Sequence, residues 1–359
     1  METQPKRPIL RGIARPHYKG ADGFSRHLPD GFTPHMLRYA YSYDKDFDGT
    51  GMTVAVICAL DNVALQENMR VFCKEFSLPL PEMEQLYPFG RAETTSDRWL
   101  IESSLDTQWV HVFAPGAKIC TVFAKNANID SLLECALYAC DVIGADVVSM
   151  SFGTGESTRL SEYAESFSGK NCILTASSGD IGSAVSFPSS LPFCISVGGT
   201  AMTLDDGGKR KYAETAWQNS GGGKSTLFHI PVWQERFSDI AVMSKGMRAC
   251  PDVSMYADER RGASIYVSQL GGWATAGGTS LSNACFAGVA ATVRQKKREL
   301  SSSHRMLEYL YKKAGETEYL SPQYNYYDVI YGSSGKFVAR RGWDFCTGLG
   351  SPVIKQLLL

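Results

Sequence analysis

Short apolar segments without polar interruption recur along the chain. Residues 53–60 form one such run, which is rich in β-branched side chains and has the length of a single strand. Strands that are apolar on both faces are typical of a parallel sheet covered on both sides. Similar segments follow at residues 118–123, 147–151, 172–176 and 194–197. The pattern therefore predicts a buried, mostly parallel sheet.

Helical patterns lie between these strands, most clearly at residues 96–113 and 128–143. Alternating strands and helices, joined by right-handed crossovers, place helices on both faces of a parallel sheet. We therefore expect an α/β fold of three layers. Residues 1–30, rich in Arg, Gly, Pro and His, are expected to form an irregular lead-in. Residues 31–359 show neither an internal repeat nor a low-complexity linker, so we expect them to form a single domain.

The charge balance argues against several classes of partner. The chain has 36 basic and 37 acidic residues, a formal net charge of −1, and no long run of one sign. We therefore expect no nucleic-acid partner and no membrane partner. No apolar stretch approaches the roughly 18 residues that span a bilayer, and the N-terminal 30 residues lack the apolar core of a secretory signal. The expectation is a cytoplasmic monomer.

Cysteine usage supports the same compartment. The ten cysteines are scattered, and several lie within apolar runs, as Cys58 does. Scattered cysteines in a large chain without a signal segment are typical of buried free thiols in a reducing environment. No Cys-x-x-Cys pair is present, so a structural zinc site is not expected.

A glycine-rich turn before an apolar helix is the first candidate for chemistry. Gly277-Gly278-Thr279-Ser280 leads into a run of small and apolar residues that reaches residue 291. Glycine permits a tight turn, and the free N–H groups at a helix start favour negative charge. Ser280 in this position is suited to attack a carbonyl beside an oxyanion site. The alternative is that Ser280 only caps a core helix.

The base that would activate Ser280 is not expected to be a histidine. None of the six histidines stands in a His-Gly-Thr turn, so a Ser-His-Asp triad is not predicted. Glu102 and Asp106 are four residues apart, which places both carboxyls on one face of a helix. Apolar neighbours such as Leu105 favour burial, and a buried pair that shares one proton has a raised pKa. The alternative is a solvated acidic face.

A third acid follows a predicted strand. Asp180 stands just past residues 172–176, and the carboxyl ends of parallel strands are where ligands bind in open α/β sheets. The alternative is an ordinary turn aspartate. A phosphate-binding loop is not predicted at residues 221–226, because the motif would require glycine where the chain has Gln218.

The order of the short motifs resembles one family. From about residue 32 to 352 the chain is similar to the sedolisins, serine-carboxyl peptidases with a subtilisin-like fold. The motifs that carry the resemblance are Glu102-x-x-x-Asp106, Ala114-Pro115-Gly116-Ala117, Ser149-Met150-Ser151-Phe152-Gly153, Ser177-Ser178-Gly179-Asp180, Phe187-Pro188, Val197-Gly198-Gly199-Thr200, Glu214-x-x-Trp217, Ser220-Gly221-Gly222-Gly223-x-Ser225, Pro251-Asp252-Val253-Ser254, Gly278-Thr279-Ser280 and Gly342-Trp343-Asp344-x-x-Thr347-Gly348-Leu349-Gly350-Ser351-Pro352.

The resemblance implies an endopeptidase that acts on peptide or protein substrates. We expect an acidic pH optimum, because Glu102, Asp106 and Asp180 would carry the chemistry without a catalytic histidine. The resemblance also implies that Ser280 is the nucleophile, Glu102 the general base, Asp106 the acid that orients the base, and Asp180 the carboxyl that stabilises the oxyanion. Gly277 stands where the family more often has serine, and the family's usual long prosegment is replaced by a short lead-in, which leaves an extracellular location as the alternative. The rival function is a catalytically silent relative that binds peptides or partners.

The C-terminal loops carry a candidate calcium site. Asp328 and Asp344 bring two carboxylates together with several carbonyls, the oxygen ligands that calcium prefers. The resemblance implies one structural Ca²⁺ held by these two side chains and by the backbone oxygens of Val329, Arg340 and Gly342. Arg340 stands where the family usually has glycine. The alternative is a pair of ordinary loop acids.

Overall fold

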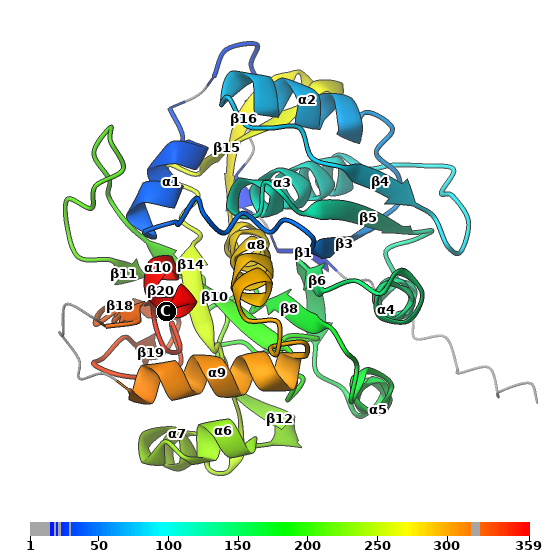
Figure 1. Ribbon diagram of the computed structural model, residues 1–359. Helices are drawn as coiled ribbons and strands as arrows, with labels where there is room; N and C mark the ends of the chain where they lie inside the picture. The colour runs from blue at the N-terminus through cyan, green and yellow to red at the C-terminus, as the bar shows by residue number, and fades with distance from the viewer. Residues whose placement is uncertain (1–14, 18, 21–22, 29, 317–323) are drawn as a thin grey trace, which may run out of the picture.

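The computed structural model describes residues 15–17, 19–20, 23–28, 30–316 and 324–359. Its centre is a mostly parallel sheet, and the predicted apolar segments are its strands (Figure 1). Seven neighbouring strands run parallel to one another. In spatial order they are β4 (Met83–Leu86), β5 (Lys118–Ala124), β3 (Thr53–Ala59), β6 (Val147–Met150), β8 (Ile173–Ser177), β10 (Ile195–Ala201) and β14 (Val253–Tyr256).

Helices cover both faces of this sheet, which confirms the predicted three-layer α/β fold. Two long helices, α3 (Asp97–Phe113) and α8 (Thr279–Lys296), pack side by side against one face. On the other face lie α4 (Ile129–Tyr138) and α9 (Ser303–Gly315). The prediction for residues 96–113 is confirmed by α3.

The second predicted helix, at residues 128–143, changes geometry part-way. The α-helix α4 gives way to a π-helical segment, η1 (Ala139–Ile143), which ends at Gly144 in the left-handed conformation. A π-helical turn is rare, and its hydrogen bonds join residues five apart instead of four, which makes the helix wider. Hydrophobic spacing alone could not reveal this change of winding, because both forms continue the same helical segment.

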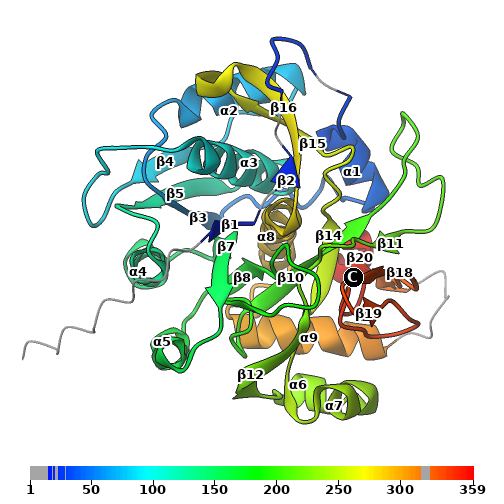
Figure 2. The same ribbon diagram turned by 180° about the vertical axis from the view of Figure 1, so that it is seen from behind.

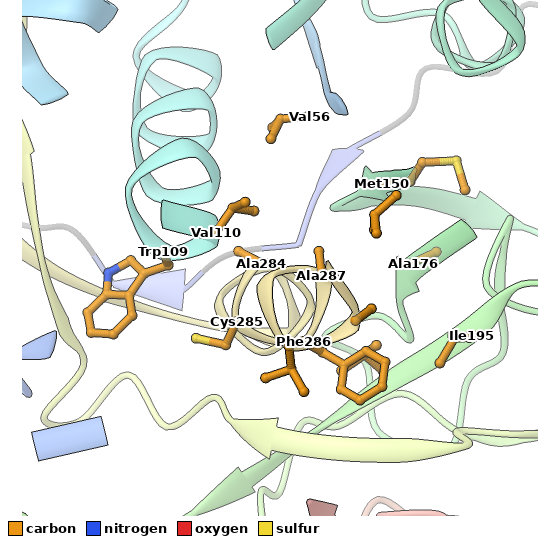
Figure 3. Close-up of a cluster of buried hydrophobic side chains, with 14 of the residues drawn as sticks. Val56, Trp109, Val110, Met150, Ala176, Ile195, Ala284, Cys285, Phe286 and Ala287 are labelled. Atoms are coloured by element: carbon orange, nitrogen blue, oxygen red, sulfur yellow. The ribbon is translucent and has the colours of Figure 1, made fainter. Parts of the chain in front are cut away.

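Helices α3 and α8 are buried on almost all sides, and small residues allow them to approach closely. Figure 3 shows Ala284 and Ala287 of α8 beside Val110 of α3. At Gly288, an added Cβ would lie 2.7 Å from both the Phe113 Cβ and the Val110 carbonyl oxygen. A larger residue there would push the helices apart. This close contact fixes α3, which carries Glu102 and Asp106, against the helix that carries Ser280.

The N-terminal segment differs from the irregular lead-in that the composition suggested. Residues Arg15–Pro16 form β1, which pairs antiparallel with β7 (Phe152–Gly155). Residues Lys19–Gly20 form β2, which pairs antiparallel with β16 (Gly272–Gly277). Figure 2 shows both short strands beside the N-terminal end of α8. Residues 15–17 and 19–20 are therefore part of the folded structure at the place where Ser280 lies, whereas residues 1–14, 18, 21–22 and 29 of the predicted lead-in lie outside the described residues.

Among the described residues, no helix combines the length and the apolar character that crossing a bilayer requires. Every cysteine is a free thiol, and all but Cys140 are buried. The predicted free thiols are confirmed.

Candidate active site

Ser280 stands in the first turn of α8, directly after a glycine turn. Gly278 has a φ of +90°, which glycine adopts without the strain of a Cβ. At Gly277 an added Cβ would lie 2.5 Å from the Ala257 carbonyl oxygen, so the chain passes too close for a side chain. The Ser280 hydroxyl donates to the Ser151 carbonyl oxygen at 3.2 Å. The N-cap of this helix is Gly278, so Ser280 lies inside the helix and is not its capping residue.

Glu102 and Asp106 project from α3 into the interior. Their exposed fractions are 1% and 0%, which excludes the solvated acidic face. Within the described part of the chain, their four carboxyl oxygens accept no hydrogen bond of ordinary length. A buried carboxylate without a donor is costly, so these groups favour the protonated form. Two buried carboxyls without such hydrogen bonds do not stabilise the fold, so we expect a chemical role for them.

Burial and mutual repulsion set the proton affinity of this pair. Burial raises the pKa of Glu102 well above its usual range, and the charge of Asp106 raises it further, while the neighbouring Ser280 hydroxyl opposes this with a smaller effect. Burial also raises the pKa of Asp106, and the Ser151 hydroxyl opposes it. The Ser280 hydroxyl thus acts on Glu102, and Asp106 stands one helical turn further along α3.

Asp180 reaches the same helix start from the end of β8. Its Oδ1 accepts the backbone N–H and the hydroxyl of Thr279, both at 2.8 Å. Its Oδ2 is shielded from solvent and has no partner among the described residues. Burial raises the pKa of Asp180 to about 7, against the lowering effect of the two Thr279 bonds. Asp180 is thus tied to the residue before Ser280, rather than acting as an isolated turn aspartate.

The N-terminal segment crosses this group of residues as an extended peptide. The backbone N–H of Ser280 donates to the carbonyl oxygen of His17 at 2.7 Å, and the N–H of His17 donates to the Ser151 carbonyl at 3.1 Å. The strand pairs with β7 and β16 lie on either side of His17. A peptide carbonyl therefore sits at the helix N-terminus beside the Ser280 hydroxyl.

The side chain of His17 fills a small pocket next to this carbonyl. Its Nδ1 lies 2.9 Å from the Ser177 hydroxyl. An added Cβ at Gly153 would lie 2.7 Å from the imidazole Cε1, so glycine leaves room for the ring. Burial lowers the pKa of His17 to about 4, with a smaller contribution from Lys19. The pocket therefore holds the neutral imidazole.

Sequence reasoning missed the role of Ser151, although this residue stood in one of the quoted motifs. Its carbonyl accepts from both Ser280 and His17, and its hydroxyl acts on Asp106. Asn283, one turn after Ser280 on α8, donates to the hydroxyl of Ser151 at 3.1 Å. The signal available was the pair of serines that follows a buried strand, where parallel sheets place ligand-binding groups.

Comparison with known proteins now decides the family. The model of the subtilase family matches residues 100–336.

The chain belongs to the subtilase family.

Its relatives place it among the sedolisins. Kumamolisin of Bacillus sp. (strain MN-32) is 27% identical over 391 residues, which cover 97% of this chain and 68% of kumamolisin. Sedolisin of Pseudomonas sp. (strain 101) is 32% identical over 183 residues, which cover 48% of this chain and 30% of that protein. These relatives confirm the predicted class, a serine-carboxyl peptidase of the sedolisin type.

Solved structures support the fold. Pseudomonas sedolisin, described as a serine-carboxyl proteinase complexed with two molecules of pseudo-iodotyrostatin, superposes with a TM-score of 0.79. That alignment has 24% sequence identity and covers 92% of this chain and 98% of the other. The subtilisin-like architecture predicted for this sedolisin relative is confirmed.

The acids predicted to bind calcium lie close together in the C-terminal loops. Asp328 accepts the N–H of Gly342 at 3.1 Å, and Asp344 accepts the N–H of Arg340 at 2.9 Å. Burial, with a smaller contribution from Asp344, raises the pKa of Asp328 to about 6. The described residues contain no cluster of three or more His, Cys, Asp or Glu side chains that could hold a metal. Two adjacent carboxylates with loop carbonyls nevertheless fit a hard cation such as Ca²⁺, which takes oxygen ligands.

Proposed function

We propose that the protein is an endopeptidase in which Ser280 attacks the scissile carbonyl and Glu102 takes its proton. The observation that supports this best is the hydrogen bond from the Ser280 backbone N–H to the carbonyl oxygen of His17. A donor at a helix N-terminus that already holds a peptide carbonyl is placed to stabilise the negative oxygen of a tetrahedral intermediate. The attacking hydroxyl belongs to the same residue, so nucleophile and oxyanion donor share one position.

Glu102 acts as general base and then as general acid in this proposal. Burial disfavours charge on the pair, so accepting the Ser280 proton is favourable once the hydroxyl begins to attack. Glu102 then returns the proton to the leaving amine. Asp106, one helical turn away, shares a proton with Glu102 and holds it in the orientation that Ser280 requires. Burial raises the pKa of both acids, so the pair keeps a shared proton at a pH where ordinary carboxyls have lost theirs.

Asp180 completes the oxyanion site when it is protonated. Its Oδ1 is occupied by Thr279, so the free Oδ2 is the oxygen that would carry the proton and donate to the substrate. A carboxyl with a pKa of about 7 is mostly protonated in acid and loses this ability as the pH rises. Activity is therefore expected to be greatest below neutral pH.

The N-terminal segment provides the natural test substrate. Residues 15–17 and 19–20 lie beside Ser280 and pair with β7 and β16 as a bound peptide pairs with strands, and the His17 carbonyl is the one that accepts the Ser280 N–H. The experiment is incubation of a synthetic peptide with the sequence of residues 11–24 with the full-length protein at pH 4 to 7, followed by mass spectrometry. Cleavage after His17 by the wild type, and none by Ser280→Ala, is the expected result. A chain that binds this peptide without cutting it at any pH is the silent relative instead.

We also propose one structural Ca²⁺ held by Asp328 and Asp344 with the backbone oxygens of Val329, Arg340 and Gly342. The cation would neutralise two carboxylates whose pKa values burial raises, and Asp344 raises that of Asp328 further. It would act on the stability of the C-terminal loops and take no part in peptide hydrolysis.

A further inference from the structure

Two cysteine side chains that belong to no predicted site are in direct contact. The Sγ atoms of Cys140 and Cys172 lie 2.8 Å apart. Cys140 is in the π-helical segment η1, and Cys172 immediately precedes β8. A disulfide has a sulfur–sulfur distance of about 2.05 Å, so bond formation requires a movement of less than about 1 Å.

The backbone around both residues is already fixed by other bonds. Lys170, two residues before Cys172, donates to both carboxyl oxygens of Asp141 at 2.6 and 2.7 Å. The carbonyl of Cys172 accepts the N–H of Ser303 at 3.0 Å. The Lys170–Asp141 pair joins the two segments independently of the sulfur atoms, and the Ser303 bond anchors Cys172 to the start of α9. The proximity of the thiols is therefore a property of the fold at this point and not of two freely moving side chains.

The two sulfurs differ in access. Cys172 is 1% exposed, whereas Cys140 is partly exposed to solvent. Cys140 is therefore the residue of the pair that a soluble oxidant meets first, and the second thiol lies 2.8 Å from its sulfur. A reachable cysteine next to a resolving cysteine is the arrangement that thiol–disulfide exchange requires.

We propose that Cys140 and Cys172 form a redox-active pair that closes to a disulfide when the protein meets a small disulfide such as oxidised glutathione. In the first step the Cys140 thiolate attacks one glutathione sulfur, which forms a mixed disulfide and releases one reduced glutathione. In the second step the sulfur of Cys172 attacks the sulfur of Cys140 and displaces the other glutathione. Two protein thiols lose two hydrogens, and one oxidised glutathione becomes two reduced molecules.

The bond would join η1 to the beginning of β8, the strand that leads to Asp180. A cross-link restricts the unfolded chain and so raises stability when the native geometry accepts it. We expect the closed form to melt a few degrees higher than the open form. The pair would remain open in a reducing compartment and close in an oxidising one, so its state reports the environment in which the protein works.

The test compares the full-length wild type with Cys140→Ala and with a matched control, Cys135→Ala, which removes a thiol from the neighbouring helix α4. The hydrogen bond with Cys172, and then burial, raise the pKa of Cys140, so incubation with oxidised glutathione is done at about pH 8.5. Intact mass, non-reducing peptide mapping and thermal melting are measured. The wild type and Cys135→Ala should lose the mass of two hydrogens and yield one linked peptide pair containing residues 140 and 172.

Cys140→Ala should show neither the mass loss nor the rise in melting temperature. Since Cys140 is partly exposed, its replacement by alanine is a mild change, and the melting curve of the reduced variant verifies that it folds. The proposal is overturned if the folded wild type keeps its mass, if it stops at a glutathione adduct, or if Cys140→Ala still loses two hydrogens.

Discussion

Buried acids at two places in this protein have opposite surroundings. Asp252 is fully buried, and its two oxygens receive the guanidinium of Arg248 at 2.8 and 2.6 Å. Tyr311 and the Ser196 N–H also donate to it, each at 2.8 Å. Glu102 and Asp106 are equally buried, yet no comparable donor or cation faces them within the described structure.

The difference distinguishes a carboxylate that stabilises the fold, Asp252, from carboxyls that are available for proton transfer, Glu102 and Asp106. A buried carboxylate that is paired with arginine and fully hydrogen-bonded stays ionised and holds its surroundings in place. A buried pair without an ion-pair partner, opposed only by the Ser280 and Ser151 hydroxyls, keeps its oxygens available to protons. Burial of an acid is therefore not by itself a sign of catalysis, and the inventory of its donors distinguishes the two cases.

The largest expected effect is on turnover at the unpartnered pair. Glu102→Gln should lower kcat/KM by about 10³-fold or more, because the amide cannot accept the Ser280 proton. The melting temperature should stay the same or rise, since a neutral amide replaces a buried acid. Ser280→Ala should behave likewise.

Ser282→Ala is the matched control. It removes a buried hydroxyl from the same helix, one that donates to the Met255 carbonyl at 2.8 Å, and the variant should keep its activity. A Glu102→Gln protein within tenfold of wild type would show that Glu102 is not the base.

Substitution of Asp252, the acid paired with Arg248, should have the opposite effect: it should lower stability and leave turnover unchanged. Asp252→Ala leaves the Arg248 guanidinium buried without its partner, which costs about 3–5 kcal/mol of unfolding free energy. Urea unfolding should show this loss, while kcat/KM per folded molecule stays near that of the wild type. Loss of activity without loss of stability would place Asp252 with the chemical group and remove the distinction.

The effect at Asp328 and Asp344 is expected to be smaller than that at Asp252, because backbone N–H groups satisfy their carboxylates in part. A bound Ca²⁺ at 100 times its Kd would raise stability by about 2.7 kcal/mol. Thermal melting with calcium and then with excess chelator should differ by several degrees in the wild type and not in Asp328→Ala. Equal melting temperatures in the wild type under both conditions would contradict the calcium proposal.

The smallest expected effect is a pH dependence that rests on Asp180. Its folded pKa of about 7 lies above the ordinary value of 3.8, so the native state binds the extra proton between these values and its contribution to stability falls as pH rises through that window. Activity should fall about tenfold per pH unit above 7. Asp180→Asn should weaken turnover at pH 5 but flatten this decline. A wild-type kcat/KM that climbs to a plateau at pH 8 would argue for a different mechanism.

The sequence predicted the parts of this structure that depend on local pattern. Of the predicted run 53–60, residues Thr53–Ala59 form β3, because an apolar run of strand length is buried on both faces in a covered parallel sheet, and the spacing of Glu102 and Asp106 put them on one side of α3. The approach of α3 to Ser280 could be proposed only through the family resemblance, since it depends on helix contacts such as that at Gly288. The docking of His17 could not be predicted, because Pro16 favours an extended backbone without specifying which strands it joins. Contact between Cys140 and Cys172 likewise depends on the π-helical winding.

The position of residues 15–17 and 19–20 has a kinetic consequence for any free peptide. A segment tethered to its own binding site competes at an effective concentration that is on the order of millimolar for short flexible links. A second peptide can enter only in the fraction of molecules from which the tether has departed, and its apparent Kd rises in inverse proportion to that fraction. Because His17 is held as the neutral imidazole with a pKa of about 4, acid that protonates the free segment below pH 6.5 increases that fraction. Assays begun by a drop in pH should therefore show a lag before the steady rate, with a length set by departure of the tether and independent of the concentration of added peptide.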